Sequence, residues 1–504
     1  MSVSDSTAAK RPLKILEALS FLRLHVLQVM SATVLVLVPC FWHRHIEAGD
    51  LGSHLYNAWL AQLVAKGQAP GLYVVSRWNN VLADLSFFHL GNLIGLHAAE
   101  RVVVASAVLI VFWGVLVFIT AVTDRPPWIL TPCLAALAYG YAFSMGFLNY
   151  YFSLGLACFA LAIVWRGGAG NWLTALPVAF LTLLAHPIGF LWLIATLVYV
   201  TLWRLIPEWW RLALPLAAAA AFLFIRYYIA DYSEFDVSWP QMAFYLRNGS
   251  DQLNLYGHPY ALLAEGATLW GILCFILGLL LNYKNLEGAG KRLRLALELY
   301  LVAFCATLLL PENIHPDVYA GWIGLIVSRL TAISAILGLC VLGSFRPRKL
   351  YFAGFAVCAT VFFVLLYRDT ANLNRLEDNA DRLVATLPYE TRVVPVLNAP
   401  DDWRIEFIHH TVDRACIQHC FTFSNYEASS LQFRVRARPG NSIACSRSDD
   451  AESMPSGDYV VKPTDPPLTA IYQCGDSDWT KLCAAPLHPG EKTEIPTLDS
   501  GDNQ

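Results

Sequence analysis

The sequence predicts an all-α polytopic membrane protein with a small α/β domain at its C-terminal end. Of the 504 residues, 56% are hydrophobic and 14% are charged, whereas soluble domains carry about 25% charged residues. Hydrophobic runs of about 20 residues, the length that a helix needs to cross a bilayer, recur up to residue 367. After that residue the composition becomes that of a soluble domain.

About eleven hydrophobic runs predict membrane-spanning helices, so a transmembrane domain is expected over residues 24–367. The runs lie near residues 24–43, 101–121, 129–146, 150–165, 172–186, 188–203, 212–229, 261–282, 295–310, 322–343 and 350–367. The first run exceeds the core of a signal peptide and lacks a clear cleavage site. We therefore expect a signal anchor preceded by a cytoplasmic N-terminus, residues 1–23.

Lysine and arginine residues predict the orientation of the chain. With the N-terminus in the cytoplasm, 15 of the 35 basic residues fall in short inner segments, as the positive-inside rule requires. Two of these segments are the basic clusters at 284–294 and 346–349. Residues 44–100, the loops near 230–260 and 311–321, and a domain over 368–504 are then extracytoplasmic.

The segment that follows the first run contains the first candidate site. A helix that starts near Asp50 would place Asp50, His54 and Asn57 on one face, because positions i, i+4 and i+7 stack along a helix. Leucine and tryptophan side chains form a neighbouring apolar stripe, so this helix could lie flat on the membrane. The alternative is that Asp50 only caps the helix, since aspartate often bonds the free amides of a first turn.

The rest of the outer loop 44–100 is too long for a simple hairpin between two spans. A turn at 67–71 contains glycine and proline, and a second amphipathic segment runs from Asp84 to Glu100. We expect two surface helices joined by this turn, because long ordered loops of this kind usually carry function.

Further polar residues are expected near the same membrane face. Asn149 and Tyr150 follow the third run, and His186 precedes a proline between the fifth and sixth runs. Glu312 and His315 lie in a later outer loop that leads to Arg329. Counting from residue 322 places Arg329 about 10 Å below the outer surface, a depth at which arginine usually faces a polar cavity or an anion. The alternatives are that His186 caps a helix end, and that Arg329 pairs with an acid or extends to the surface.

The C-terminal domain is expected to contain a helix over 372–387 and short strands at 392–397, 432–437, 459–461 and 470–474. Five cysteines fall in it: Cys416, Cys420, Cys445, Cys474 and Cys483. An oxidising compartment favours two disulfides and one spare thiol. His409, His410 and His419, close to Cys416 and Cys420, also permit a zinc site, although the spacing fits no standard zinc motif.

Several functions are disfavoured. A net charge of -3 and a pI near 6.5 argue against a nucleic-acid partner. The segment 287–291 lacks the first glycine of a phosphate-binding loop, and no serine nucleophile motif is present. The chain shows no internal repeat, so a transporter built from duplicated halves is not supported.

The layout resembles the GT-C superfamily of polytopic membrane glycosyltransferases. The shared features are an acidic residue just after the first span, two surface helices in the first outer loop, many spans and a C-terminal extracytoplasmic domain. The acidic pair of that family is loosely matched by Glu47 and Asp50, which are three residues apart instead of adjacent, and its tyrosine-rich helix by residues 53–56. Both acids therefore remain candidates for the catalytic position, and we favour Asp50.

The resemblance implies transfer of a hexose from a polyprenyl-phosphate-linked sugar to a lipid, glycan or protein acceptor. It also implies an active site on the extracytoplasmic face of a membrane, expected to be a bacterial inner or plasma membrane. A carboxylate must take the proton of the acceptor hydroxyl, so Asp50 is the expected base and His54 the residue that orients it. Arg329 is the expected partner of the lipid phosphate.

The other expected substrate-binding residues are His186, Glu312, His315, Asn149 and Tyr150. No pattern indicates a cofactor, although a divalent metal is compatible with the acidic groups. The competing hypotheses are a transporter or channel and a non-catalytic membrane scaffold. A transporter predicts ionisable groups throughout the depth of several spans, whereas here they cluster near the outer ends.

Overall fold

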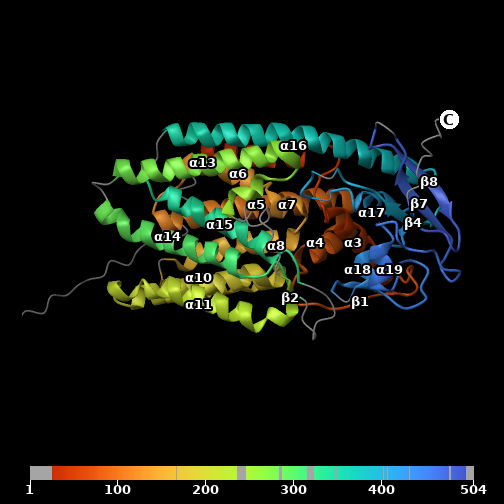
Figure 1. Ribbon diagram of the computed structural model, residues 1–504, viewed down its shortest axis with the longest axis horizontal. Coiled ribbons are helices and arrows are strands. Elements are labelled where there is room, and N and C mark those ends of the chain that lie inside the picture. The colour runs from red at the N-terminus through yellow and green to blue at the C-terminus, as the bar shows by residue number, and fades with distance from the viewer. Residues whose placement is uncertain are drawn as a thin grey trace, which may run out of the picture.

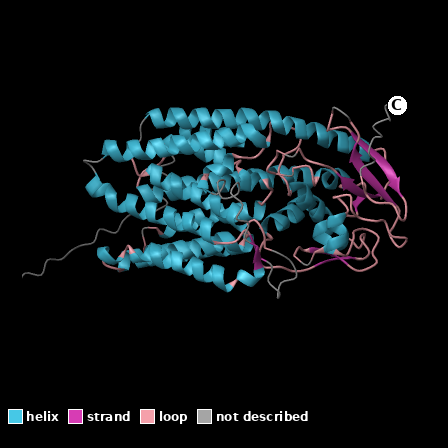
Figure 2. Cartoon of the chain, viewed as in Figure 1, coloured by secondary structure: helices cyan, strands magenta, loops and turns pink. Residues whose placement is uncertain are grey.

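The computed structural model describes residues 25–165, 167–234, 246–282, 286–314, 323–346, 349–400, 402–405, 407–430, 432–475 and 478–494. The chain is mostly helical. A long bundle of helices occupies most of the molecule, and the strands gather at one end of it (Figures 1 and 2). The short helices α3 and α4 lie between the bundle and these strands (Figure 1).

The helices before the C-terminal region are α2 (Val26–Leu37), α3 (Leu51–Ala65), α4 (Leu82–Ile94), α5 (Leu96–Thr123), α6 (Thr131–Leu137), α7 (Tyr141–Ser144), α8 (Leu148–Val164), α9 (Ala169–Ala185), α10 (Pro187–Leu205), α11 (Ala213–Tyr228), α13 (Gly257–Asn282), α14 (Leu286–Leu309), α15 (Ile326–Gly343) and α16 (Lys349–Val384). Among the described residues, six helical segments are long and apolar enough to cross a membrane: 96–123, 187–205, 208–228, 257–281, 326–343 and 349–384. Their length and composition indicate a membrane-embedded protein.

One predicted span is not a regular helix. The run 129–146 contains a short 3-10 turn, α6 and α7, and the chain is extended at Gly140, which precedes α7. A Cβ atom at Gly140 would lie 3.0 Å from the carbonyl oxygen of Gln252. The close approach of that neighbouring segment explains why this run is broken.

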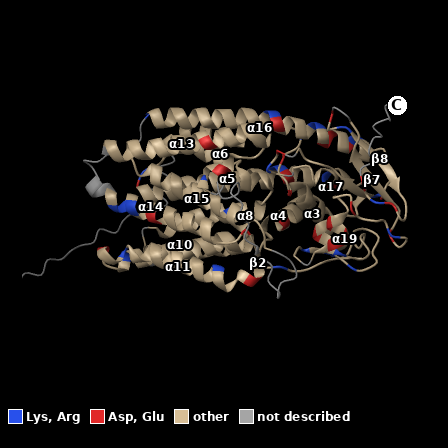
Figure 3. Ribbon diagram, in the orientation of Figure 1, with Lys and Arg blue, Asp and Glu red and all other residues tan. Residues whose placement is uncertain are grey.

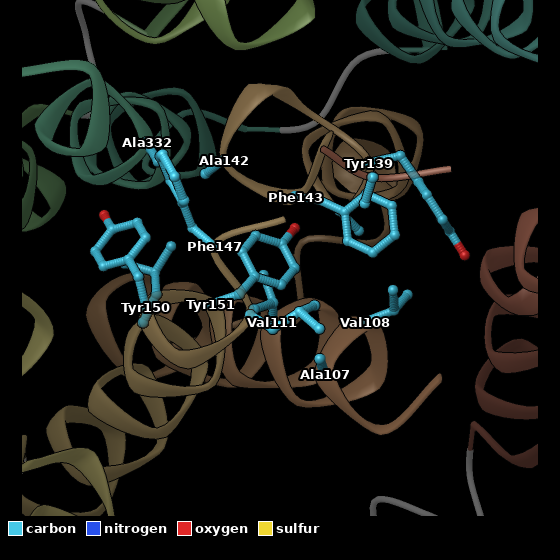
Figure 4. Close-up of a cluster of buried hydrophobic side chains, with 14 of the residues drawn as sticks. Ala107, Val108, Val111, Tyr139, Ala142, Phe143, Phe147, Tyr150, Tyr151 and Ala332 are labelled. Atoms are coloured by element: carbon cyan, nitrogen blue, oxygen red, sulfur yellow. The ribbon is translucent and has the colours of Figure 1, made fainter. Parts of the chain in front are cut away.

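Aromatic side chains and close helix contacts build the core of the bundle. Figure 4 shows Tyr139, Phe143 and Tyr151 gathered with small side chains of α5, and all three aromatic residues are buried. Beside them, Gly114 of α5 lies directly against the backbone of Gly155 of α8, so that a Cβ at Gly114 would overlap it. Small residues let membrane helices approach closely, which fixes α8 and the segment before it in the bundle.

The C-terminal region holds a four-stranded sheet in the order β5-β4-β7-β8. Its strands are β4 (Arg392–Val396), β5 (Phe421–Thr422), β7 (Leu468–Gln473) and β8 (Leu482–Leu487), and its short helices are α17 (Thr411–Cys416), α18 (Tyr426–Ser429) and α19 (Ser448–Ser453). Strand β4 is parallel to β5 and β7, and β7 is antiparallel to β8.

The expected strands at 392–397 and 470–474 correspond to β4 and β7. The strand expected at 432–437 is β6 (Val435–Ala437), which pairs with β1 (Leu72–Val74) of the outer loop instead of joining the sheet. The strand expected at 459–461 is absent from the described structure, where Val460 makes a single bridge to Lys492.

Helix α16 passes without interruption through the expected domain boundary at 367/368. It spans Lys349–Val384 and runs along the bundle to the C-terminal sheet (Figure 1). The helix expected over 372–387 is therefore the second half of α16. A polar sequence alone does not end a helix, and α16 contains no proline and no glycine after Gly354.

Two disulfides, Cys416–Cys420 and Cys474–Cys483, lie in the C-terminal region, and Cys445 is a buried free thiol. This agrees in number with the two bridges and one spare thiol expected from the sequence. Because the sulfurs of Cys416 and Cys420 are bonded to each other, they are not thiolate ligands for zinc.

Candidate active site

Helix α3 is enclosed by protein, contrary to the expectation that it lies flat on the membrane. Every residue from Leu51 to Gln62 is buried. C-terminal segments cover its outer side: the Tyr56 hydroxyl accepts a hydrogen bond of 2.9 Å from the Thr422 amide, and Ser53 Oγ donates to Glu427 at 2.9 Å. The stripe that resembled a membrane-binding face is therefore a contact with a distant part of the same chain.

Asp50 immediately precedes α3, but its side chain makes no capping hydrogen bond within the described chain. Its backbone amide donates to the Met145 carbonyl at 3.0 Å. Gly146 has a positive φ of 81°, and a Cβ there would overlap the backbone of Asp50. This tight backbone contact directs the Asp50 carboxylate away from the helix, and the side chain remains 31% exposed.

Asp50 faces a cavity of about 1290 Å³ between the bundle and the C-terminal region. The wall formed by the bundle contains Asp50, Met145, Phe147, Leu325 and Arg329. The opposite wall comes from C-terminal segments and contains Asn398, Trp403, His409, His410, Asp413, Asn425, Tyr426, Gln432, Phe433 and Glu452. Cavities of this kind, with aromatic surfaces and a few converging polar groups, commonly bind small molecules.

Arg329 enters the same cavity from the start of α15. The helix begins at Ile326, so Arg329 lies in its first turn, closer to the helix end than the depth of about 10 Å expected from the sequence. The guanidinium lies 4.1 Å from the centre of the Phe147 ring, and Nη1 donates to the Gly324 carbonyl at 2.6 Å. Its buried Nε atom has no hydrogen-bond partner among the described residues, so it can still donate to a ligand.

The histidine nearest Asp50 is His410, which the sequence analysis considered only for zinc. Its Nε2 lies 3.8 Å from Asp50 Oδ1, and its Nδ1 lies 2.7 Å from Asp413 Oδ2. Gly52 makes this proximity possible, because a Cβ there would overlap the His410 carbonyl. Burial disfavours the His410 cation, but the hydrogen bond and charge of Asp413, with the charge of Asp50, raise the pKa of His410 above its ordinary value. The raised pKa favours the cationic form of His410.

His54 does not orient Asp50. Its Nδ1 lies 2.8 Å from Asp84 Oδ1, and Asp84 also accepts a hydrogen bond of 3.2 Å from Asn149. Although burial lowers it, the charge and hydrogen bond of Asp84 raise the pKa of His54 to about 9. Because Asp50 precedes the helix, the i, i+4 rule does not hold for its side chain, and His54 turns to helix α4 instead.

Glu47 is also buried, away from the cavity. Its Oε1 accepts a hydrogen bond of 2.6 Å from Asn374. Burial raises the pKa of Glu47 to about 7, although the nearby Arg414 opposes this. Of the two acids left open by the sequence, Asp50 is the one whose carboxylate reaches the cavity.

The other predicted substrate-binding residues have structural contacts, and none is among the described residues of the cavity wall. Asn149 accepts a hydrogen bond from the Ala83 amide, and His186 Nδ1 accepts one from the Ile188 amide. Glu312 accepts from the Val327 and Ser328 amides at the start of α15. The Tyr150 hydroxyl donates to the Arg329 carbonyl at 2.7 Å. His315 lies outside the described residues.

Comparison with known proteins identified no relative of this chain. No protein family, characterised protein or solved structure matches the chain. The site combines one partly exposed carboxylate, a histidine whose pKa is raised and an arginine around a large cavity. Such a site can accept a proton from a hydroxyl and stabilise an anionic leaving group.

Proposed function

We propose that this protein is a membrane glycosyltransferase that moves a hexose from a polyprenyl-phosphate donor to a hydroxyl acceptor at the extracytoplasmic face. The observation that carries the proposal is the shared cavity of Asp50 and Arg329. A base and an anion-binding cation are the two groups that this reaction needs most. Their position at the end of the bundle is where a donor with a membrane-embedded tail would present its phosphate.

In the proposed reaction, the acceptor hydroxyl forms a bond to the anomeric carbon of the donor sugar. Asp50 accepts the hydroxyl proton, and the bond between the anomeric carbon and the phosphate oxygen breaks. The electron pair leaves with the polyprenyl phosphate, whose developing charge is met by Arg329 and the His410 cation. Asp413 keeps His410 oriented and protonated, and it contacts His410 rather than the reacting atoms.

The proposed topology has about eleven spans, with the cavity and the C-terminal region outside the cytoplasm. Support comes from the charge distribution: the basic residues of α14 lie at the end of the bundle remote from the C-terminal sheet (Figure 3). Basic segments usually remain in the cytoplasm. This topology agrees with the GT-C resemblance, in which lipid-linked sugars are used at the outer face.

Binding of undecaprenyl phosphate to the purified protein tests the role of Arg329. Arg329→Met removes the cation and keeps an apolar side chain of similar length. Loss of a charge-assisted hydrogen bond of about 1.5–3 kcal/mol predicts roughly 10- to 100-fold weaker binding. Arg438→Met is the matched control, because Arg438 is exposed in the C-terminal region and should bind as the parent does. Equal affinity of both variants for undecaprenyl phosphate would overturn the proposed phosphate site.

A further inference from the structure

A cluster of ligand-type side chains lies where the segment after α2 crosses α16, outside the described walls of the Asp50 cavity. His45 belongs to that segment, and Asp378 and Asp381 are three residues apart on α16, so they share one helix face. One ligand atom from each of the three residues lies within 4.8 Å of the others. Figure 3 shows acidic and basic residues together on this C-terminal half of α16.

The imidazole of His45 is held firmly and directed at the two carboxylates. Its backbone amide donates to Asn374 Oδ1 at 2.7 Å, and Asn374 Nδ2 donates to its carbonyl at 3.2 Å. The His45 side chain is 7% exposed, and Nδ1 lies 3.2 Å from Glu377 Oε2. Nε2 lies 3.6 Å from Asp378 Oδ1 and 3.7 Å from Asp381 Oδ2. Nε2 is buried and has no hydrogen-bond partner among the described residues.

This arrangement is that of a metal ligand with its supporting carboxylate. A histidine that binds metal usually donates its other ring N–H to a carboxylate, which fixes the tautomer, and Glu377 is placed to accept it. The lone pair of Nε2 then points at two further carboxylates, a repulsive contact that a cation bound among the three groups would relieve. Ligand atoms about 2.1 Å from a tetrahedral zinc ion lie roughly 3.4 Å apart, close to the 3.6 and 3.7 Å between His45 Nε2 and the two carboxylate oxygens.

From this geometry we propose that His45, Asp378 and Asp381 bind one divalent transition-metal ion, with Zn²⁺ as the best match. One nitrogen and two carboxylate oxygens, completed by water, suit zinc better than magnesium, which prefers octahedral oxygen coordination. The ion would tie the segment that leads to Asp50 to helix α16. The proposal is independent of the glycosyltransferase assignment.

Arg44 forms ion pairs with the same two carboxylates, so a bound metal ion would have to displace it. Its Nη1 lies 2.8 Å from Asp378 Oδ1 and its Nη2 lies 3.0 Å from Asp381 Oδ2. The Arg44 side chain is 63% exposed, so it can move into solvent, and exposed ion pairs contribute only about 0–1 kcal/mol. Arg44 supplies one positive charge against two carboxylates, whereas a divalent ion balances both.

Zinc retention by the full-length protein tests this site. Protein stripped with EDTA and then loaded with Zn²⁺ should retain one equivalent after dialysis, measured by elemental analysis, and Mg²⁺ should not displace it. His45→Gln and Asp378→Asn should each weaken Zn²⁺ binding about 10-fold or more. Arg44→Ala should strengthen it up to about 5-fold, and Asp50→Asn should leave it unchanged.

A thermal unfolding control separates loss of the site from loss of the fold. Metal-free Asp378→Asn and Asp381→Asn proteins should unfold at the temperature of the metal-free parent, and only the parent should be stabilised by added Zn²⁺. No retained zinc in the parent, or equal retention in the parent and the His45→Gln and Asp378→Asn variants, would overturn the proposal.

Discussion

Arg414 connects the C-terminal region to the membrane bundle, and its removal should destabilise the protein strongly. It is 8% exposed and lies 3.0 Å from Glu377 Oε2 and 3.6 Å from Glu100 Oε1, and it donates to the Ile46 carbonyl at 2.9 Å. With an effective dielectric constant of about 20, one pair at this distance is worth roughly 5 kcal/mol before desolvation. Removing one partner of a buried pair costs about 3–5 kcal/mol.

We therefore expect Arg414→Met to lower the free energy of unfolding by about 3–5 kcal/mol at pH 7.5. Arg375→Met is the control, because Arg375 is an exposed residue of the same helix as Glu377, and its loss should change stability by less than about 0.5 kcal/mol. Chemical denaturation in detergent, followed by tryptophan fluorescence, measures both variants.

The loss of stability in Arg414→Met should depend on pH. Burial raises the pKa of Glu47 to about 7, above the value of about 4.3 for an unfolded glutamate. The folded state therefore takes up a proton as the pH falls through this window, which favours folding. Arg414→Met removes the opposing positive charge, so its deficit should shrink at pH 5. A deficit below about 1 kcal/mol at pH 7.5, or one that grows on acidification, would refute the reasoning.

Three further predictions follow from the same structure. Asp413 and Asp50 raise the pKa of His410, which favours its cation, so the affinity for a polyprenyl-phosphate sugar should fall as the pH rises through the pKa of His410. His410→Gln should flatten that profile, and an unchanged profile would contradict the role of this cation. Eight of the 12 cysteines are free, so alkylation of the denatured, unreduced protein should modify eight cysteines. After reduction it should modify all 12. Stoichiometric zinc together with 12 reactive thiols before reduction would exclude the disulfides. An impermeant maleimide added to intact cells should label Ser500→Cys and not Ala289→Cys; the reverse result would place the cavity on the cytoplasmic side.

The sequence predicted the bundle better than the surroundings of α3. Long apolar runs identify helices locally, so α5, α10, α13 and α15 were expected close to their observed positions, whereas α16 continues to Val384, beyond the expected run 350–367. The broken run at α6 and α7 depends on the close approach of Gln252 to Gly140, which is a tertiary contact. The burial of α3 depends on contacts with residues more than 360 positions away, such as Thr422 and Glu427, and no local sequence pattern predicts these contacts.

The residues of the candidate site were also predicted only where a local pattern indicated them. Asp50 and Arg329 were predicted because an acid after the first span and an arginine in a span are unusual locally. The sequence did not predict that His410 contacts Asp50 or that Asp413 contacts His410, and the His409–His410 pair was considered only for zinc. The i, i+3 spacing of His410 and Asp413 is compatible with a contact at the start of α17, but only the fold places this pair beside Gly52 and Asp50. His54 was misassigned because helical spacing was applied to a residue that precedes the helix.

The most direct test of the central claim compares sugar transfer by Asp50→Asn and Glu47→Gln. Both substitutions remove a carboxylate and keep its shape, but only Asp50 reaches the cavity. The assay uses radiolabelled hexoses on undecaprenyl phosphate, with the source membrane fraction as acceptor. We predict that Asp50→Asn lowers turnover about 100-fold or more and that Glu47→Gln, at equal amounts of folded protein, stays within about threefold of the parent. Full transfer by purified Asp50→Asn protein would contradict the account.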